Sequence, residues 1–323
     1  MGKKVLALKY VVLSVVCIFV ISSCAGIAGN RVKKGYPMPE IVSHEKWQET
    51  PPVGFPARGV RRNIAPGESI IYENLETTLL EMIPSKDNSN KAPDSIKVRL
   101  SKNGKIEERE VKGFSAFNWE GYHFAIPAVH TRKKEMGSGL TEFEITTLDS
   151  IPQDIAQSTT AGDAAKRARI PHEIRMITLH HSGSPKPLTL EDDPIKKLRG
   201  LQKWGQNAKN WWDLPYHFLI DLNGTIYEGR DYHYMGETNT RYNPSGHFLI
   251  SVMGNYEIQK PTRVQIDAIT DLMAWAVSEF NIPLDKIYGH KDLAPTACPG
   301  KYLYAYLEDG TFKQGIKKRL GME

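Results

Sequence analysis

The sequence predicts an α/β fold, a mixed β-sheet flanked by helices, preceded by a smaller β-rich domain. Between residues 173 and 323, short apolar runs alternate with longer segments of helical spacing, which is typical of a sheet covered by helices. Between residues 61 and 150, apolar and polar residues alternate around turn signals, as in antiparallel strands. The length of 323 residues suits two such domains.

The first residues carry the features of an export signal. A basic start, "MGKK", precedes the apolar run "VVLSVVCIFVI", which is shorter than the roughly 20 residues of a membrane span. Small residues in "ISSCAG" then precede Cys24. We expect residues 1–23 to be a lipoprotein signal peptide, with lipid attached to Cys24. The alternative is an ordinary signal peptide with an incidental cysteine.

This start predicts a protein of the bacterial cell envelope, lipid-anchored to a membrane. Ala25 is compatible with the outer membrane, facing the periplasm. The net charge of +5 is spread along the chain without a block of five like charges, so we expect no nucleic-acid partner. Residues 24–60 are rich in Gly and Pro and are expected to form a tether. The sequence carries no signal of oligomeric state.

The β-rich domain is expected over residues 61–150. In "SIKVRLSKNGKIEEREVKGF", apolar residues alternate with polar ones before Asn103-Gly104, a pair that favours a tight hairpin turn. "YHFAIPAVH" and "LTEFEITTLD" are further strand candidates. We find no chemical motif here, and an interaction platform is one possible role. Residues 151–172 are expected to be a linker.

From residue 173 the predicted elements alternate between strands and helices. They are a strand in "IRMITLHHSG", a helix in "DDPIKKLRGLQKWGQNAKNWW", a hairpin in "YHFLIDLNGTIYEGR", a strand in "HFLISVMGNY" and a helix in "PTRVQIDAITDLMAWAVSEF".

Histidines and one cysteine of this half are candidates for a metal site: His180, His181, His217, His290 and Cys298. If Cys17 is removed with the signal and Cys24 is lipidated, Cys298 is left as an unpaired thiol in an oxidising compartment. Zinc favours imidazole and thiolate ligands. His180 and His181 are neighbours on a strand and point to opposite faces, so only one should be a ligand. Alternatively, the histidines are structural and the thiol is simply buried.

Four motifs occur in one order over residues 174–303: "MITLHHSG", "DLPYHFLIDLNGTIYEGRD", "ISVMGNYE" and "GHKDLAPTACPG". Together they resemble the zinc N-acetylmuramoyl-L-alanine amidases of the phage-lysozyme and peptidoglycan-recognition-protein type. The resemblance implies an amidase domain over residues 173–323 with Zn²⁺ as cofactor. It also implies hydrolysis of the amide between N-acetylmuramic acid and L-alanine in peptidoglycan or muropeptides.

Carried over position by position, the resemblance implies His180, His290 and Cys298 as zinc ligands and Tyr216 as a catalytic residue. Thr296, two positions before the cysteine, would be the second catalytic residue, where phage enzymes have a lysine. Related recognition proteins that bind wall fragments without cutting commonly lose the zinc cysteine. The chain keeps it, which favours an enzyme over the alternative, a non-catalytic peptidoglycan-binding module on the same fold.

Arg230 and Trp212 are candidates for binding substrate in a groove. The alternatives are a structural salt bridge for Arg230 and core packing for Trp212. The family often shows a Gly-x-His pattern after "EGRD", whereas this chain has Gly236-Glu237-Thr238. The substrate contacts on this side of the site are therefore open.

Overall fold

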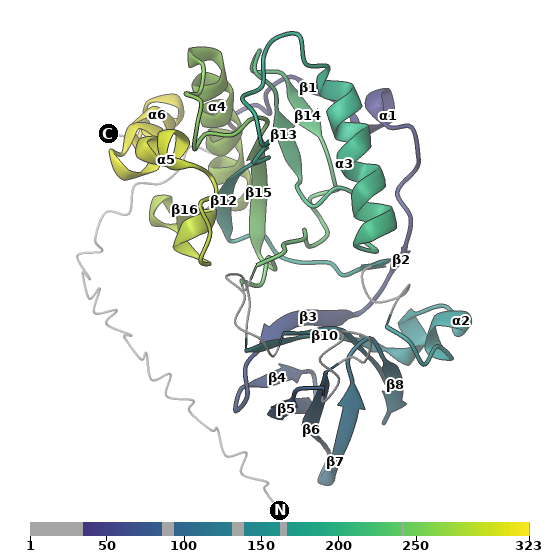
Figure 1. Cartoon of the computed structure of the whole chain (residues 1–323). Helices are drawn as coiled ribbons and strands as arrows, with labels where there is room; N and C mark the ends of the chain where they lie inside the picture. Colours follow the sequence, from purple (N-terminus) through teal and green to yellow (C-terminus); the bar gives the residue numbers. More distant parts are fainter. Residues whose placement is uncertain (1–34, 86–93, 131–138, 162–166, 241, 323) are drawn as a thin grey trace, which may run out of the picture. The chain divides into compact units, whose positions relative to one another are not determined.

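A six-stranded sheet in the order β1-β14-β13-β15-β12-β16 organises the larger half of the computed structural model (Figure 1). The structure describes residues 35–85, 94–130, 139–161, 167–240 and 242–322. Neighbouring strands are parallel except for the antiparallel hairpin of β13 and β14. The strands are β1 (Ile41–Val42), β12 (Met176–His181), β13 (Phe218–Ile220), β14 (Ile226–Glu228), β15 (His247–Val252) and β16 (Ile287–Gly289).

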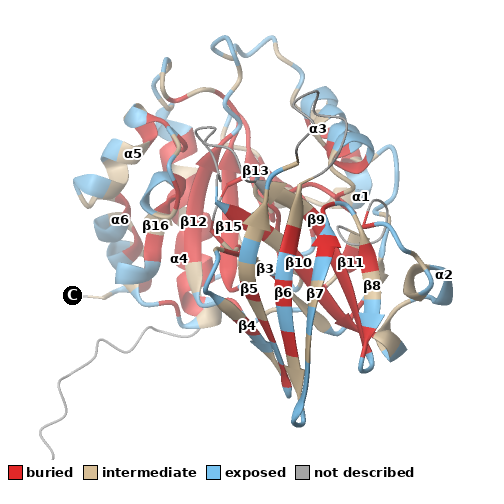
Figure 2. Cartoon of the chain, turned by 60° about the horizontal axis from the view of Figure 1, so that its bottom comes forward, coloured by how far each residue is buried: buried red, intermediate tan, exposed pale blue. Residues whose placement is uncertain are grey.

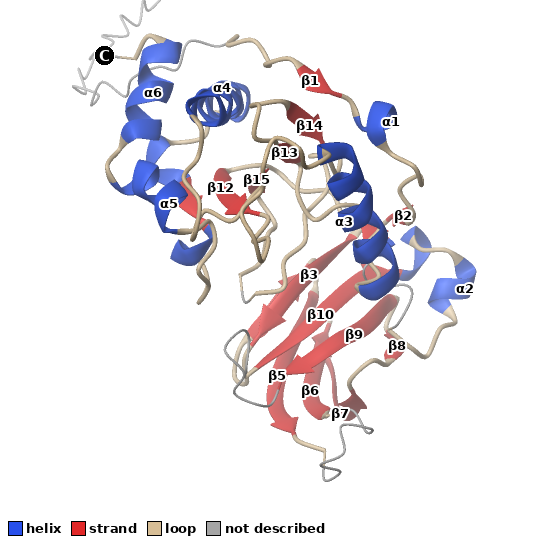
Figure 3. Cartoon of the chain, turned by 45° about the horizontal axis from the view of Figure 1, so that its top comes forward, coloured by secondary structure: helices blue, strands red, loops and turns tan. Residues whose placement is uncertain are grey.

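Helices cover both faces of this sheet (Figure 3). Phe218 and Ile220 pack into a core shared with α4 and α6, whereas Leu219 between them packs with Leu198 of α3 on the opposite face. This alternation is the expected geometry of a strand. It confirms the predicted mixed sheet flanked by helices. The helices are α1 (His44–Trp47), α3 (Pro194–Ala208), α4 (Arg263–Phe280), α5 (Lys301–Glu308) and α6 (Thr311–Leu320).

The two long helices begin at residues that bind the free backbone N–H groups of the first turn. Asp193 accepts hydrogen bonds from the backbone N–H groups of Ile195 and Lys196, and Pro194 is the first residue of α3. Thr262 and Gln265 form a reciprocal capping box at the start of α4. Figure 2 shows that the strands between these helices, β12, β13 and β15, are buried almost throughout.

The β-rich half consists of two four-stranded antiparallel sheets, β3-β10-β9-β8 and β4-β5-β6-β7. They share one apolar core, which includes Ile96, Phe124 and Phe143. Asn103 and Gly104 connect β6 and β7 with φ values of 50° and 83°, as a two-residue hairpin turn requires. The strands are β3 (Gly59–Ile64), β4 (Ser69–Tyr72), β5 (Leu75–Ile83), β6 (Ser95–Lys102), β7 (Lys105–Lys112), β8 (Ala116–Trp119), β9 (Tyr122–His130) and β10 (Leu140–Thr147).

Much of the segment expected to be a tether is part of the larger half. Ile41 and Val42 pair in parallel with β14. Trp47 is 0% exposed and donates a hydrogen bond to the carbonyl oxygen of Glu228 over 2.7 Å. A few apolar side chains fix this segment although it lacks periodicity. The expected signal peptide and Cys24 lie outside the described residues.

The β-rich half is an insertion between two short strands of the chain. β2 (Phe55–Pro56) and β11 (Ala168–Arg169) pair in parallel, so the segment expected as a linker, 151–172, contains a short strand. It also contains α2 (Gln153–Ala156), which follows the 3₁₀ turn Leu148–Ser150. The chain therefore leaves the larger half after β2 and returns to it at β11.

Candidate metal centre

Two parallel strands bring the candidate histidines to the same edge of the sheet. His180 is the fifth residue of β12, and His290 directly follows β16, which pairs with β12 through Leu179 and Gly289. Carboxyl ends of parallel strands are the usual location of sites in open sheets. Cys298 reaches the same point from the loop before α5, and one ligating atom of each of the three residues lies within 4.8 Å of the others. The structure thus brings together the three ligands expected from the sequence.

The thiol is held in a defined position. Cys298 Sγ lies 3.7 Å from His180 Nδ1 and accepts a hydrogen bond from the backbone N–H of His181 over 3.3 Å. The rings of His180 and His290 are 4.5 Å apart between centroids. Two imidazoles and one thiolate form a donor set that suits zinc, and three protein ligands leave a fourth position open.

Burial determines the protonation state of the candidate ligands. Desolvation lowers the pKa of His180 well below its ordinary value, and it lowers that of His290 to about 4. Both imidazoles are therefore neutral at pH 7 and have a lone pair for a metal. Desolvation also raises the pKa of the Cys298 thiol to about 12. Metal binding would have to release this proton, as is general for thiolate ligands.

The other candidate histidines do not join this group. The Nδ1 atom of His181 accepts a hydrogen bond from the backbone N–H of Tyr256. His217 accepts at Nδ1 from the backbone N–H of Leu249, and its Nε2 lies 3.1 Å from the carbonyl oxygen of Tyr234. Of the pair His180-His181, His180 belongs to the group of converging ligating atoms and His181 does not. The contacts of His217 give it a structural role.

The two proposed catalytic residues lie beside the ligands. The ring of Tyr216, just before β13, is 5.0 Å from that of His180 between centroids. Burial and the neighbouring Cys298 raise the pKa of Tyr216, so its hydroxyl keeps its proton and can donate it in a hydrogen bond. Thr296 is half-buried, and its Oγ1 accepts a hydrogen bond from the backbone N–H of Cys298 over 3.2 Å.

Arg230 and Trp212 are not placed in a groove. The Arg230 side chain is 0% exposed and donates to the carbonyl oxygens of Leu214, Met235 and Asp213. Trp212 is 2% exposed, with the Arg230 guanidinium 4.5 Å from its ring centroid. The expectation that both bind substrate is corrected, because neither side chain reaches the surface. The alternatives of core packing and a structural ion pair fit the structure instead.

Sequence reasoning missed two residues that contact the ligands. The Tyr242 hydroxyl lies 3.0 Å from His180 Nε2, and Thr240 Oγ1 lies 2.6 Å from His290 Nε2. Such partners fix the ring orientation and tautomer of a metal-binding histidine. The only signal in the sequence was the departure at Gly236-Glu237-Thr238. These contacts occupy Nε2 of each ring, and Nδ1 of His180 lies 3.7 Å from Cys298 Sγ.

The absence of a side chain at Gly236 allows the backbone of this segment to pack close to the sheet. A Cβ atom at this position would come within 2.2 Å of Leu249 Cδ1 and 2.7 Å of the Pro215 carbonyl oxygen. The next four residues, Glu237 to Thr240, are called the support loop below. Its first residue donates its backbone N–H to Pro215, the neighbour of Tyr216, over 3.0 Å.

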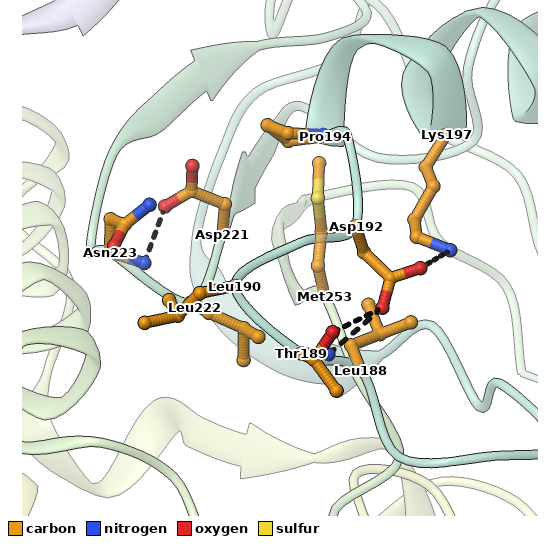
Figure 4. Close-up of a pocket in the computed structure, with 10 residues that line it drawn as sticks. All are labelled: Leu188, Thr189, Leu190, Asp192, Pro194, Lys197, Asp221, Leu222, Asn223 and Met253. Atoms are coloured by element: carbon orange, nitrogen blue, oxygen red, sulfur yellow. Dashed lines mark hydrogen bonds and ion pairs between the residues drawn. The ribbon is translucent and has the colours of Figure 1, made fainter.

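A pocket of about 40 Å³ at the start of α3 is lined by none of the candidate metal ligands (Figure 4). Its charged side chains already pair within the pocket. Asp192 is 2.9 Å from Lys197 and accepts from the backbone N–H of Thr189, while Asp221 accepts from that of Asn223.

Across the described residues, no helix is both long and apolar enough to span a membrane.

Comparison with known proteins shows which family and which proteins the larger half resembles. The family described as N-acetylmuramoyl-L-alanine amidase matches residues 170–301. Peptidoglycan-recognition protein SC2 of Drosophila melanogaster is 32% identical over 152 residues, covering 46% of this chain and 82% of the relative. Peptidoglycan-recognition protein LB of the same organism is 30% identical over 146 residues, covering 43% of this chain and 62% of the relative.

A mammalian enzyme and a solved structure complete the comparison. The N-acetylmuramoyl-L-alanine amidase of Mus musculus is 28% identical over 137 residues, covering 42% of this chain but only 26% of the relative. A solved structure of the wild-type Drosophila recognition protein LB is 30% identical, with a TM-score of 0.39, and the match covers 44% of this chain and 87% of that one. Through residues 170–301, this chain belongs to the N-acetylmuramoyl-L-alanine amidase family, which it shares with peptidoglycan-recognition proteins.

Proposed function

We propose that the protein is a zinc-dependent N-acetylmuramoyl-L-alanine amidase that acts on peptidoglycan or muropeptides. The observation that carries this proposal is the convergence of His180, His290 and Cys298, with ligating atoms within 4.8 Å of one another. The family contains both named amidases and recognition proteins. The complete ligand set, together with Tyr216, supports the enzyme.

In this proposal His180, His290 and Cys298 hold the zinc ion. Bound zinc would polarise the amide carbonyl and lower the pKa of a water molecule to about 7. Tyr216 keeps its proton at neutral pH and would donate a hydrogen bond to the developing oxyanion, an interaction that is strong in a buried site. Thr296 has no useful pKa and would orient the substrate or the attacking water through its hydroxyl group.

Cleavage of purified peptidoglycan tests the proposal. The full chain should release stem peptides with new L-alanine amino termini in the presence of Zn²⁺, and a chelator should stop the release. Tyr216→Phe should bind metal as the wild type does but cleave about 100-fold more slowly, because one oxyanion donor is lost. If the wild type releases no peptides in Zn²⁺ and Cys298→Ser binds wall fragments equally well, the protein is a binding module instead.

We further propose that the protein is a lipoprotein of the bacterial envelope, anchored through Cys24. The support is the order of a basic start, an apolar run and small residues before this cysteine. A cell that expresses the full chain should incorporate labelled palmitate into the protein. Cys24→Ala should abolish the label, whereas Cys298→Ala should retain it, and equal labelling of both variants would contradict the anchor.

A further inference from the structure

One strand of the β-rich half presents polar side chains away from its own core. Val60 and Ile64 of β3 pack against the apolar core of the β-rich half. Arg61 and Asn63 alternate with them and so point to the other face of the strand. Arg61 is nevertheless only 6% exposed, so a charged group of the β-rich half is buried against something else.

Arg61 meets the first residue of the support loop. Its Nη1 and Nη2 atoms lie 2.6 and 2.8 Å from Glu237 Oε1. The same carboxylate oxygen lies 3.2 Å from Nη1 of Arg230 in the larger half. On the other side, Arg61 Nε lies 3.4 Å from Glu144 of β10. Because Glu237 is 4% exposed, this charge network is shielded from solvent and has a fixed geometry.

Asn63 meets the last residue of the support loop. Its Nδ2 donates to the Thr240 carbonyl oxygen over 3.3 Å. The side chain of this same threonine contacts His290 Nε2 over 2.6 Å. Two successive hydrogen bonds therefore connect β3 to a candidate metal ligand. The pocket between β3 and the support loop has a volume of about 20 Å³, room for little more than one water molecule.

We propose that Arg61 and Asn63 are positioning residues, which hold the support loop and, through Thr240, the imidazole of His290 in its metal-binding orientation. As an acceptor, the Thr240 hydroxyl would keep the proton of His290 on Nε2 and leave the Nδ1 lone pair for the metal. The β-rich half thus supplies part of the surroundings of the metal site. The inference rests on the proposed function for the presence of a metal.

The full chain with single substitutions tests this inference by two measurements. The first is the affinity for Co²⁺, followed by its visible absorption in competition with a chelator. The second is the His290 tautomer in the metal-free chain, read from ¹⁵N NMR of the imidazole. The test variants are Asn63→Ala and Arg61→Met. Thr240→Val is the reference that removes the hydroxyl itself, and Leu79→Ala is the control for stability alone, since Leu79 is buried in the core of the β-rich half.

Thr240→Val should weaken Co²⁺ binding by about 10- to 100-fold, the usual effect of losing a partner of a metal-binding histidine. Asn63→Ala and Arg61→Met should weaken it by about 10-fold and give His290 a mixture of tautomers. Leu79→Ala should lower Tm without either change. Asn63→Ala removes only one half-exposed amide group, so this variant should fold. It therefore tests the inference even if Arg61→Met does not fold.

The inference is overturned if Asn63→Ala and Arg61→Met keep the wild-type Co²⁺ affinity and a pure Nε2–H tautomer while only Tm falls, as in Leu79→Ala. A wild-type chain that binds Co²⁺ but cleaves no peptidoglycan would contradict the proposed reaction alone. A wild-type chain that binds no metal would contradict the metal site, and the NMR measurement would still decide whether β3 orients His290.

Discussion

Arg230 carries its charge in a place that water does not reach. Its guanidinium is 0% exposed and donates to three backbone carbonyl oxygens, and it shares Glu237 with Arg61. The sequence left two roles for this residue, a substrate contact in a groove and a structural salt bridge. The carbonyl oxygens that bind it come from parts of the chain whose proximity the sequence does not show.

Arg230→Met should therefore act on stability and not on substrate affinity. Removing the buried guanidinium takes a donor from three carbonyl oxygens and leaves Glu237 with Arg61 as its remaining cationic partner, which costs about 3–5 kcal/mol. We expect a large loss in the free energy of unfolding measured with urea. The exposed Arg175→Met is the matched control and should change it by less than about 0.5 kcal/mol. A raised KM with unchanged stability would restore Arg230 as a substrate contact.

The burial of His247 makes the free energy of unfolding depend on pH. It is 5% exposed, its Nδ1 lies 2.7 Å from Thr178 Oγ1, and burial lowers its pKa to about 4. In the unfolded chain its pKa is about 6.5, so below that value the unfolded state binds more protons than the native state. The contribution of His247 is complete above pH 6.5 and is lost as the pH falls towards 4, by up to about 3 kcal/mol.

His247→Gln should flatten this part of the stability curve. Urea unfolding of the metal-free chain at pH 7.5 and pH 4.5 measures the difference without a contribution from metal release. An unchanged slope for His247→Gln would show that this histidine titrates alike in both states.

At the scale of elements, β1 and α1 extend the larger half on the N-terminal side of its family match. Their two and four residues are too short for a hydrophobic period, so the sequence could only suggest a tether. What fixes them is tertiary: the pairing of β1 with β14 and the burial of Trp47.

Trp47→Ala should lower the free energy of unfolding by about 3–5 kcal/mol, as is usual for a buried tryptophan. Trp204→Ala is the matched control, since this ring is 43% exposed, and it should cost less than about 1 kcal/mol. Thermal or urea unfolding measures both. A cost for Trp47→Ala no greater than that of the control would indicate a loose tether.

The elements that sequence did predict have strong local signals. The hairpin at Asn103-Gly104, the helices capped by Asp193 and Thr262, and the strand that ends in His180-His181 all have a local pattern that determines their structure. His290 and Cys298 were found because a motif carries both. Thr240 and Tyr242 were not found from the sequence. Thr240 is 50 positions from His290 and Tyr242 is 62 positions from His180, and only the folded chain brings each pair together.

At the scale of the whole molecule, the ends of the β-rich insertion are neighbours. The pairing of Phe55 with Ala168 places them side by side, and the backbone N–H of Ala57 donates to the carbonyl oxygen of Arg169 over 3.0 Å. A short Gly/Ser linker can therefore replace residues 58–166 without straining the larger half.

This excised chain should fold, as judged by cooperative thermal unfolding, but should bind Co²⁺ about 10-fold more weakly, because Arg61 and Asn63 are gone. Thr240→Val should weaken binding less in the excised chain than in the full chain, since coupled residues are not additive. Wild-type affinity in the excised chain would show that the larger half arranges its ligands alone.

The attachment of the insertion at β2 and β11 also determines which part of the molecule transmits a mechanical force. A pull on Gly35 reaches the larger half first at α4, where the backbone N–H groups of Gly35 and Tyr36 donate to Ser278. It then reaches β1, and both contacts precede the β-rich insertion in the chain. A force applied at Gly35 would thus reach the larger half without passing through the insertion, which leaves this half after β2 and re-enters it at β11. The contacts of Arg61 and Asn63 with the support loop would then keep their geometry while the rest of the molecule is under tension.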